Sequence, residues 1–345
     1  MRQKNIFTTS VSAWHAMVES IRSAKQSIYL EMYIFEDADM HPELDFVSLL
    51  EEKARDGVHV ALILDAFGSR GLSTSSKERL KRAGVEILFY TFYFQRTHRK
   101  LLIVDERVAF VGGVNLSRRF SEWDDLVIRM RGRLVRRITR SFARVYKTCG
   151  GRDKRVVYRV KVSPLRKARF WFVEHGIGTK RHEMRRQYER HIANAKEQIL
   201  LVTPYFIPQR WLLNALLRAI ERGVRVEVLL PIRGDYATMD RLNGYYADRC
   251  SALGIFIYWY ERMNHSKAML VDNKVGVIGS QNLDVLSFSW NAEASMFFDD
   301  PRHVSDLRET CDAWKRHSVP HCRGTNRVWY DRPLMLFMRA LEPML

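Results

Sequence analysis

The sequence predicts an α/β protein of two similar domains that arose by internal duplication, each with a mixed, largely parallel sheet flanked by helices. Helical and strand patterns alternate along the chain, and the same patterns return in the second half at a nearly constant distance. Strands that alternate with helices favour parallel pairing. At 345 residues the chain is long enough for two domains that each bury a core.

The first half alternates between helix and strand three times. Apolar residues at helical spacing predict a helix over 13–24, and alternating residues predict a strand over 27–35. A second helix is predicted over 49–55, ending at Gly57, with a strand over 58–64. A third helix leads through Gly84 into a strand over 85–90.

The second half repeats these landmarks in the same order. The segments 192–199, 221–226 and 254–258 repeat 21–28, 55–60 and 84–88, at offsets between 166 and 171 residues. A shared preference for helices would not keep the offset so constant, so we infer a duplicated unit. The basic segment 150–169 contains Gly150, Gly151 and Pro164, as exposed boundaries do. We therefore place the border between Cys149 and Lys180 and predict domains at 1–160 and 161–345.

Composition limits the classes of function. No apolar run approaches the ~18 residues of a membrane span, and the polar start does not resemble a signal peptide. The four cysteines are too scattered for zinc or redox chemistry, which fits a reducing compartment. The net charge of +18 favours an anionic partner, either nucleic acid or lipid headgroups, and does not choose between them.

The repeat contains a motif that carries chemistry. Both copies have the form His-x-Lys-x4-Asp, with His98, Lys100 and Asp105 in the first and His265, Lys267 and Asp272 in the second. Residues two apart in a strand share a face, so each histidine and its lysine are expected to point toward one spot. The lysines disfavour a metal at these histidines, because they would repel a cation. One such match usually marks a surface or core histidine, whereas two in register indicate a site.

Further polar residues follow each motif at matching distances. The segments 112–115 and 279–282 end in Asn115 and Asn282, each 17 residues after its histidine. Backbone N–H groups and the amide of such a turn are expected to donate to an anionic oxygen. Asp125 and Glu293 follow their histidines by 27 and 28 residues, where a carboxylate would hold the imidazole in one tautomer.

The paired motifs resemble the HKD signature of the phospholipase D superfamily over about residues 8–345. The segments 30–35, 65–69, 98–100, 112–115, 203–208 and 279–284 are most similar to the bacterial cardiolipin synthase group. Two features depart from that group. Leu286 replaces the arginine of the pattern Asn-Leu-Asp-x-Arg-Ser, which puts one phosphate or structural contact in doubt, and the segment between Asn115 and Trp123 is short.

The resemblance implies catalysis through a covalent phosphohistidine at the domain interface. One histidine attacks phosphorus, while the other protonates the leaving group and then deprotonates the incoming alcohol or water. We assign these roles to His98 and His265, respectively, and near-symmetry leaves the reverse open. The expected phosphate-binding residues are Lys100, Lys267, Asn115, Asn282 and Ser280. Asp125 and Glu293 would orient the histidines, and Asp105 and Asp272, though part of the catalytic motif, would brace neighbouring loops. No metal or organic cofactor is expected, because the lysines supply positive charge.

Three hypotheses for the function follow. The favoured one is phosphatidyl transfer that makes cardiolipin from phosphatidylglycerol and a second lipid or alcohol. The protein would then be cytoplasmic, or peripheral on the cytoplasmic face of the bacterial membrane. The second keeps the chemistry and hydrolyses phospholipid or nucleic acid, whose binding would weaken with salt. The third is a catalytically inactive module that binds membrane or nucleic acid, and two complete motifs count against it.

Three groups of apolar residues fit either a lipid contact or a core. Leu134, Ile138, Phe142 and Val145 share one helical face, with Arg133, Arg136, Arg137, Arg140 and Arg144 largely elsewhere, which suits an anionic membrane or a core-facing helix. The apolar segment 334–345 suits core packing or an interface. The aromatic residues Tyr205, Phe206, Trp211, Tyr258 and Trp259 suit an acyl entrance or a core.

Overall fold

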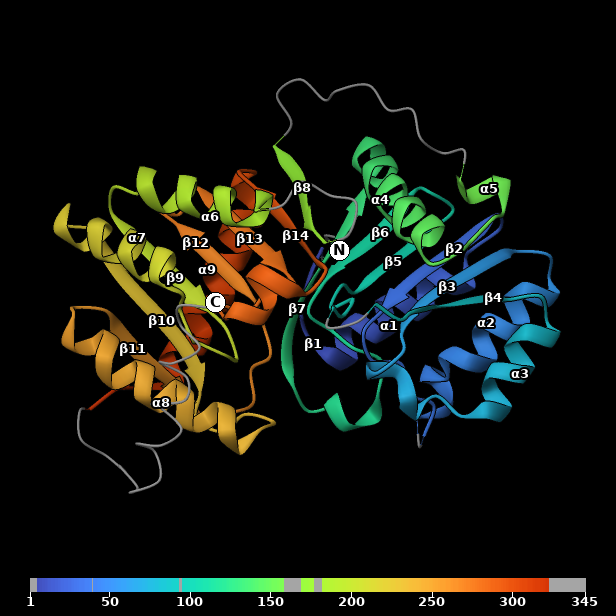
Figure 1. Cartoon of the computed structure of the whole chain (residues 1–345), viewed down its shortest axis with the longest axis horizontal. Helices are drawn as coiled ribbons and strands as arrows, with labels where there is room; N and C mark the ends of the chain where they lie inside the picture. Colours follow the sequence, from blue (N-terminus) through green and yellow to red (C-terminus); the bar gives the residue numbers. More distant parts are fainter. Residues whose placement is uncertain (1–4, 39, 93–94, 158–168, 177–181, 323–345) are drawn as a thin grey trace.

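The structure is a computed structural model with two mixed sheets (Figure 1). It describes residues 5–38, 40–92, 95–157, 169–176 and 182–322. The strand order is β1-β7-β6-β5-β2-β3-β4 in the first sheet and β15-β11-β10-β9-β12-β13-β14-β8 in the second. Inside both sheets the same six-strand order occurs, from β7 to β4 and from β14 to β11. The predicted duplication of an α/β unit is therefore confirmed.

The strand bounds follow the repeat closely. The first sheet contains β1 (Ile6–Thr9), β2 (Ser27–Met32), β3 (His59–Asp65), β4 (Glu86–Tyr90), β5 (Leu101–Val104), β6 (Val108–Gly112) and β7 (Asp124–Arg131). The second contains β8 (Phe170–His175), β9 (Gln198–Val202), β10 (Arg225–Pro231), β11 (Phe256–Tyr260), β12 (Ala268–Val271), β13 (Val275–Gly279), β14 (Glu293–Phe298) and β15 (Ser318–Pro320). The predicted border at 160 and 161 lies among 158–168, outside the described residues, and stays a prediction.

Antiparallel pairs outnumber parallel ones in both sheets, so the expectation of largely parallel sheets is wrong. Only β2, β3 and β4 in the first sheet, and β9, β10 and β11 in the second, pair in parallel. The strand after each motif lysine turns straight back through a two-residue turn with φ of 51–52°, at Asp105 and Glu106 and at Asp272 and Asn273. These hairpins put antiparallel strands beside the parallel ones.

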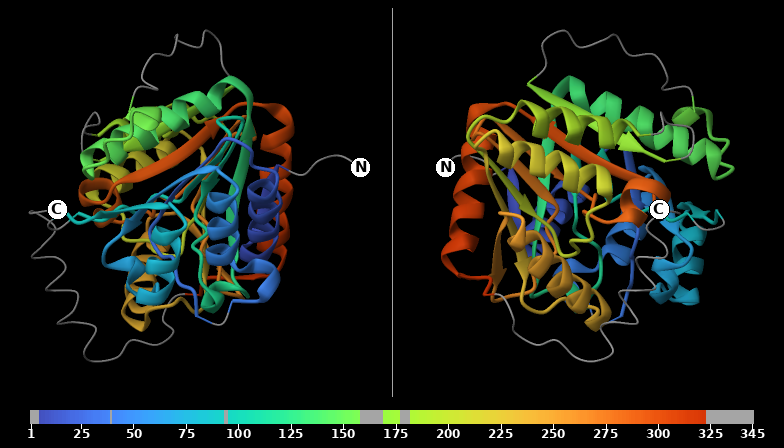
Figure 2. Two further views of the ribbon diagram at one scale, coloured as in Figure 1. Left: turned by 90° about the vertical axis from the view of Figure 1, so that its right-hand side faces the viewer. Right: turned by 60° about the vertical axis from the view of Figure 1, so that its left-hand side comes forward.

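Helices cover the outer face of each sheet, and two more flank the space between the sheets (Figure 1). The outer helices are α1 (Ser10–Arg22), α2 (Phe46–Arg55) and α3 (Thr74–Arg82) on the first sheet, and α6 (Glu183–Asn194), α7 (Arg210–Glu221) and α8 (Ala237–Ala252) on the second. Between the sheets lie α4 (Val135–Thr148), followed by α5 (Lys154–Val157), and α9 (Pro301–Arg316). Figure 2 shows α4 along one edge of this central layer and α9 along another. The halves thus share one central core.

Side-chain caps explain why two helices begin before their predicted starts. The Thr9 hydroxyl accepts a hydrogen bond from Ser12 N, and α1 begins at Ser10 instead of residue 13. Asp45 accepts from Ser48 N in the same way, so α2 begins at Phe46 instead of residue 49. In both cases the apolar periodicity reveals the core-facing residues, and the polar cap determines the first turn.

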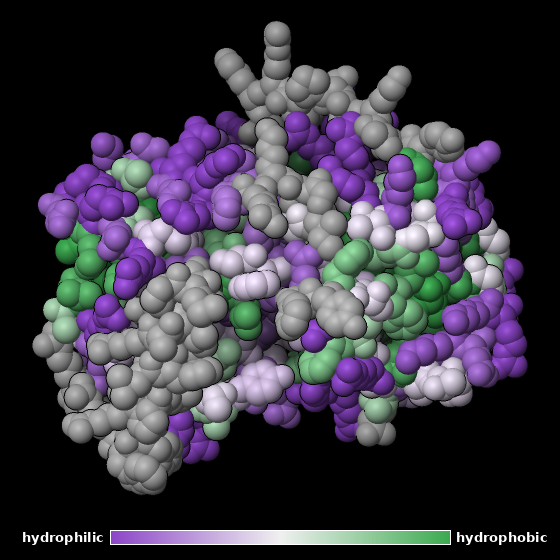
Figure 3. All heavy atoms as spheres, viewed as in Figure 1, coloured by the Kyte–Doolittle hydropathy of each residue, from purple (hydrophilic) through white to green (hydrophobic). Residues whose placement is uncertain are grey.

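Helix α4 uses its apolar face for the core. Ile138, Phe142 and Val145 are buried between the sheets, whereas Arg133 and Arg136 are exposed. The core-facing alternative is therefore correct for this helix, and only its basic side meets solvent. In the view of the molecule in Figure 3, the residues along the upper edge, around α4 and α6, are mostly hydrophilic.

Of the other two apolar groups, the structure describes only the aromatic residues. Phe206 is fully buried in the outer core of the second half and Tyr205 is nearly so, whereas Trp211, Tyr258 and Trp259 are half-buried. The segment 334–345 lies outside the described residues. None of the helices in the described ranges is long and apolar enough to cross a bilayer.

Arg99, between His98 and Lys100, turns to the opposite side of the chain and joins the two sheets. Its guanidinium lies 3.2 Å from Glu31 of β2 and 3.2 Å from Glu174 of β8. Burial raises the pKa of Glu31, and the charge of Arg99 opposes that shift. The motif is thus anchored in the core by its middle residue.

Replacing Arg99 by methionine is expected to lower the free energy of unfolding by about 3–5 kcal/mol, because Glu31 would keep a buried charge without its partner. Urea denaturation would measure the change. The matched control is Arg155→Met, which removes an exposed ion pair of 2.6 Å with Asp153 and should cost at most about 1 kcal/mol. Equal losses in the two variants would contradict a special role for Arg99.

Candidate active site

Short backbone ladders tie each motif histidine to the opposite half. His98 N donates to Ala292 O at 2.9 Å, and His265 N donates to Asp124 O at 2.8 Å. The two ladders have the same form, so the two halves meet with approximate twofold symmetry. Both histidines are buried where the halves meet.

Each histidine is paired with the carboxylate of the other half. Glu293 and Asp125 directly follow Ala292 and Asp124. The backbone hydrogen bonds therefore place each carboxylate beside the histidine of the other half. His98 Nδ1 lies 3.0 Å from Glu293 Oε1, and His265 Nδ1 lies 2.8 Å from Asp125 Oδ2. The sequence identified these carboxylates without assigning each to one histidine, and in the structure each contacts the histidine of the other copy.

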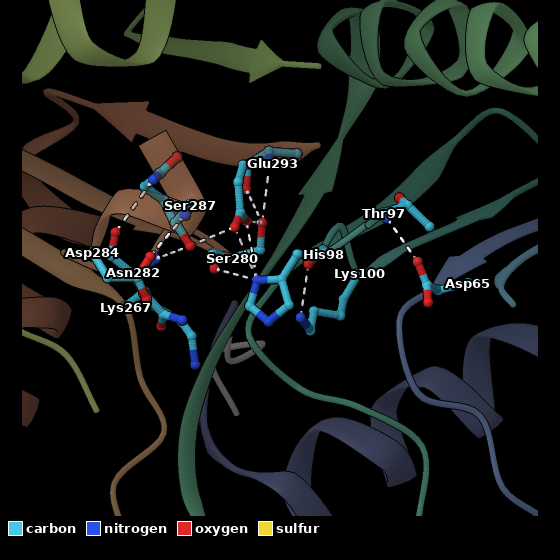
Figure 4. Close-up of polar contacts among 12 residues, drawn as sticks. Asp65, Thr97, His98, Lys100, Lys267, Ser280, Asn282, Asp284, Ser287 and Glu293 are labelled. Carbon is cyan, nitrogen blue, oxygen red and sulfur yellow. Dashed lines mark hydrogen bonds and ion pairs between the residues drawn. The ribbon is translucent and has the colours of Figure 1, made fainter. Parts of the chain in front are cut away.

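The surroundings of His98 determine its tautomer (Figure 4). Its Nδ1 faces two acceptors, the Glu293 carboxylate and Ser280 O at 3.0 Å. Nδ1 must therefore carry a proton, which leaves the lone pair of Nε2 free. Burial is the main reason that the pKa of His98 is lowered, and the charge of Lys100 adds to it. A neutral imidazole with a free Nε2 is what a nucleophile needs.

Two hydroxyl groups hold Glu293 in its charged form. Ser287 Oγ donates to Oε1 at 2.7 Å, and Ser280 Oγ donates to Oε2. Burial raises the pKa of Glu293, but the electrostatic interaction and hydrogen bond with His98, with smaller contributions from Lys100 and the Ser280 hydroxyl, outweigh burial and lower it. The Ser280 hydroxyl thus already has Glu293 as its acceptor, and the phosphate contact expected of Ser280 stays a prediction.

Ser287 is a site residue that the sequence analysis missed. The available signal was the last position of the pattern Asn-Leu-Asp-x-Arg-Ser, which Ser287 occupies. A single π-helical turn, Leu286–Trp290, brings its hydroxyl inward. The segment from Asn282 to Glu293 is one residue longer than that from Asn115 to Asp125, and a π-helical turn accommodates one additional residue.

Replacing Ser287 by alanine is expected to lower kcat about tenfold, because a hydrogen bond to a charged group contributes about 1.5–3 kcal/mol. The acidic limb of the pH profile should move to higher pH, because a less stabilised Glu293 makes His98 more basic. Steady-state kinetics against pH would measure both effects. Ser289→Ala, which changes an exposed serine two residues away, is the control. An unchanged kcat would contradict this role.

The partner of His265 is less strongly ionised. Burial raises the pKa of Asp125 to about 6. Gly113 stands where the second copy has Ser280, and a Cβ there would lie 2.2 Å from Asp125 Oδ1. No hydroxyl can therefore donate to Asp125 from this position. The two symmetric halves of the site thus differ in electrostatics.

The two lysines bring positive charge to one shared space. Lys100 Nζ donates to His98 O at 2.7 Å, and Lys267 Nζ donates to His265 O. Burial is the main cause that lowers the pKa of Lys100 well below its usual value and that of Lys267 to about 8. The pKa of His265 is also well below its usual value, first by burial and then through both lysines. A buried site with this charge suits an anionic ligand.

The two asparagines are buried beside the motifs. Asn115 Oδ1 accepts from Ile34 N at 3.2 Å, which leaves its amide nitrogen as a donor. Within the described ranges, Asn282 Oδ1 is buried without a hydrogen-bond partner. Both positions stay predicted phosphate contacts.

The backbone of the two turns behaves differently from the prediction. Gly113 N donates to Leu126 O at 2.9 Å, and Ser280 N donates to Ala294 O at 3.0 Å. These two N–H groups are already bonded to carbonyl groups of the neighbouring strands.

Asp105 and Asp272 lie at the far ends of β5 and β12 from the histidines. Their carboxylates accept hydrogen bonds of 2.7–3.2 Å from the backbone N–H groups of residues 25–27 and 196–198. This is the bracing role expected for them. Although they belong to the motif, we assign them no catalytic role.

An aromatic ring lies next to each histidine. The ring centroids of Tyr33 and His98 are 4.9 Å apart, and those of Trp123 and His265 are 5.3 Å apart. In the part of the chain that the structure describes, no group of three His, Cys, Asp or Glu side chains is placed to hold a metal ion.

The fold and the paired histidines define the phospholipase D-like class, and comparisons specify the family. The family model described as "Cardiolipin synthase, PLD-like domain" matches residues 17–146 and 188–314. The chain belongs to this family. The two matched ranges correspond to the two copies of the duplicated unit.

Individual relatives match nearly the whole chain. The chain is 29% identical to a cardiolipin synthase of Halalkalibacterium halodurans, covering 99% of this chain and 72% of that one. It is 30% identical to cardiolipin synthase 2 of Bacillus anthracis, covering 98% and 70%. The structure of phosphatidylserine synthase from Haemophilus influenzae aligns with a TM-score of 0.74 at 14% identity, over 100% of this chain and 94% of that one, and so shares the fold.

Proposed function

We propose that this protein is a phosphatidyltransferase that makes cardiolipin from phosphatidylglycerol, with a second phosphatidylglycerol as acceptor and glycerol as the product released. The observation that carries the proposal is the pair of buried histidines, each held by a carboxylate from the other half, beside two lysines. The names of the relatives support this choice of lipid over nucleic acid.

In the first step, His98 Nε2 attacks the phosphorus of the donor lipid. The bond from phosphorus to the glycerol oxygen breaks, and His265, in the imidazolium form that the bound anionic donor stabilises, gives that oxygen its Nε2 proton. Lys100 and Lys267, with the amides of Asn115 and Asn282, bind the phosphoryl oxygens and stabilise the charge that develops there. The product is a phosphatidyl group bonded to His98.

In the second step, a hydroxyl group of the acceptor attacks the same phosphorus. His265 takes the proton of this hydroxyl, a new phosphorus–oxygen bond forms, and the bond to His98 breaks. His265 thus returns to its starting protonation state. Two easier displacements replace one difficult exchange.

The electrostatics support His98 as the nucleophile. A phosphorylated imidazole that keeps its Nδ1 proton is positively charged, so it needs a firmly ionised partner. Glu293 has a lowered pKa, whereas burial raises that of Asp125 to about 6. The half with Glu293 is therefore better suited to the covalent intermediate.

The value of kcat/KM is expected to fall above about pH 8. Burial lowers the pKa of Lys267 to about 8, and a lysine is charged below its pKa and neutral above it. The free enzyme therefore loses phosphate-binding charge as the pH rises through 8. Bound phosphodiester stabilises the ammonium, so the limb in kcat should lie at higher pH. Lys267→Arg should lack this limb, and an alkaline limb that persists near pH 8 in that variant would assign it to another group.

We also propose that the protein acts as a peripheral protein on the cytoplasmic face of the membrane. The exposed Arg133, just before α4, and Arg136, in its first turn, support this placement, because each basic residue near an anionic bilayer contributes on the order of 1 kcal/mol. Sedimentation with vesicles of increasing phosphatidylglycerol content would measure the attraction. Equal binding to neutral vesicles would contradict it.

The direct test incubates the purified protein with phosphatidylglycerol vesicles and follows lipid products by mass spectrometry. Cardiolipin and glycerol in equal amounts are expected. Phosphatidic acid without cardiolipin would replace the proposal by a lipid hydrolase. Cleavage of a labelled oligonucleotide without lipid turnover would replace it by a nuclease.

A further inference from the structure

A cavity of about 870 Å³ lies between the two halves of the molecule, and Trp123, the neighbour of His265, is part of its lining. The loop 117–123 of the first half forms most of its lining, to which Glu36 and Ala38 of the same half and Arg262 and Met263 of the second half add. Trp123 belongs both to this lining and to the catalytic site, because its ring lies 5.3 Å from that of His265. The cavity therefore adjoins the proposed acid and base.

Arginine is the most frequent residue type in the lining of this cavity. Three arginines, Arg118, Arg119 and Arg262, face two glutamates there. The Arg119 guanidinium lies 3.2 Å from Glu36, and that of Arg262 lies 3.7 Å from Asp124. The side chains of Arg119 and Arg262 are 54% and 52% exposed. A guanidinium has five N–H donors, so both retain donors for a bound anion.

The counterpart of this loop in the second half has a different chemistry. Arg119 follows Asn115 by four residues, and Leu286 follows Asn282 by four. Leu286 is 50% exposed and Trp290 is 45% exposed. Leu286 precedes Ser287, whose hydroxyl contacts the partner of His98. The side toward His98 thus presents apolar groups, and the side toward His265 presents arginines.

The geometry of displacement determines which lipid meets the arginines. The entering hydroxyl must approach phosphorus opposite the bond to His98, because attacking and leaving groups lie in line. That direction is the side of His265, which takes the proton. The molecule in this cavity during the second step is therefore the acceptor. Phosphatidylglycerol as acceptor carries its own phosphodiester, whereas the competing acceptors glycerol and water carry none.

We propose that Arg119 and Arg262 bind the phosphodiester of the acceptor lipid and thereby favour it over glycerol and water. This inference rests on the proposed function and adds an acceptor site to it. The phosphatidyl group is transferred as described above: the acceptor oxygen bonds to phosphorus, the bond to His98 breaks, and His265 takes the proton. The arginines hold the headgroup while this occurs and take no part in the proton transfer.

A competition between two acceptors tests this site. Phosphatidylglycerol vesicles are supplied with deuterated glycerol, and both products arise from one phosphatidyl-His98 intermediate. Transfer to the lipid gives cardiolipin, and transfer to glycerol gives deuterated phosphatidylglycerol. The ratio of these products depends on the acceptor step alone, so a slower first step does not change it. Mass spectrometry measures both.

Arg119→Gln and Arg262→Gln are each expected to lower this ratio about tenfold, as for the loss of one hydrogen bond to a charged group. The control is Arg308→Gln on α9, which removes an arginine that is also 54% exposed and lies 3.5 Å from Asp312. It should keep the wild-type ratio. Melting temperatures would establish that all three variants are folded.

Three other outcomes would overturn the site. Lower turnover at an unchanged ratio would assign the arginines to the donor lipid. An unchanged ratio and unchanged turnover would show that the cavity binds neither lipid. If the wild-type protein forms neither product, the proposed function itself fails, whereas a wild-type protein that forms both products with an insensitive ratio contradicts only the acceptor site.

Discussion

Replacing His98 by alanine is expected to lower cardiolipin formation by on the order of 10⁴-fold or more, because the variant has no nucleophile to form the covalent intermediate. Burial and the contacts of Nδ1 leave only Nε2 available for this attack. Lipid mass spectrometry over long incubations would measure the loss. The variant should still sediment with phosphatidylglycerol vesicles, because membrane contact does not involve the buried imidazole.

His303→Ala provides the matched control for this variant. His303 forms a similar pair, with Nδ1 2.7 Å from Asp300 Oδ1, but it lies on α9 away from the site. Its loss should leave kcat within about twofold, as expected for a substitution away from catalytic groups. A comparable loss in both variants would indicate general damage to the fold and would contradict a specific role for His98.

A donor lipid with a p-nitrophenyl leaving group is expected to restore the first step in His265→Ala and not in His98→Ala. With the natural donor, loss of His265 should cost about 10²–10⁴-fold, because glycerol must leave with a proton. The p-nitrophenolate ion leaves without one. The second step still needs a base, so the phosphatidyl group should stay on His98.

Rapid mixing would detect this intermediate as a burst of p-nitrophenol equal to the amount of enzyme. Mass spectrometry of the digested protein should then find the phosphatidyl group on the peptide that contains His98. A burst in His98→Ala, with the modification on His265, would show that the roles are reversed. No burst in either variant would contradict the covalent mechanism.

Local patterns predicted what one copy of the repeat determines by itself. The spacing of His98 and Lys100 puts both on one side, with Arg99 on the other, and the structure has this arrangement. The same reasoning predicted that Asp105 would brace a loop. The prediction of largely parallel sheets was wrong, because the turn after Asp105 is a hairpin and apolar alternation does not specify which way a strand runs.

The pairing of carboxylates with histidines could not be predicted in this way. Spacings of 27 and 28 residues identify Asp125 and Glu293, but the partner of each depends on how the two halves meet. The hydroxyl of Ser280 was assigned to phosphate for a similar reason. Its choice of acceptor depends on the position of Glu293, on a different strand.

The crossed carboxylates also limit how this protein can be divided or can evolve. Neither half contains both a motif histidine and the carboxylate that pairs with it. A fragment with one copy of the motif should therefore be inactive even if it folds. Two fragments supplied together could regain activity only by reassembling across the same interface. A change at Asp125 or Glu293 alters the surroundings of the histidine in the opposite copy. The two copies therefore constrain each other's substitutions, although their sequences have diverged.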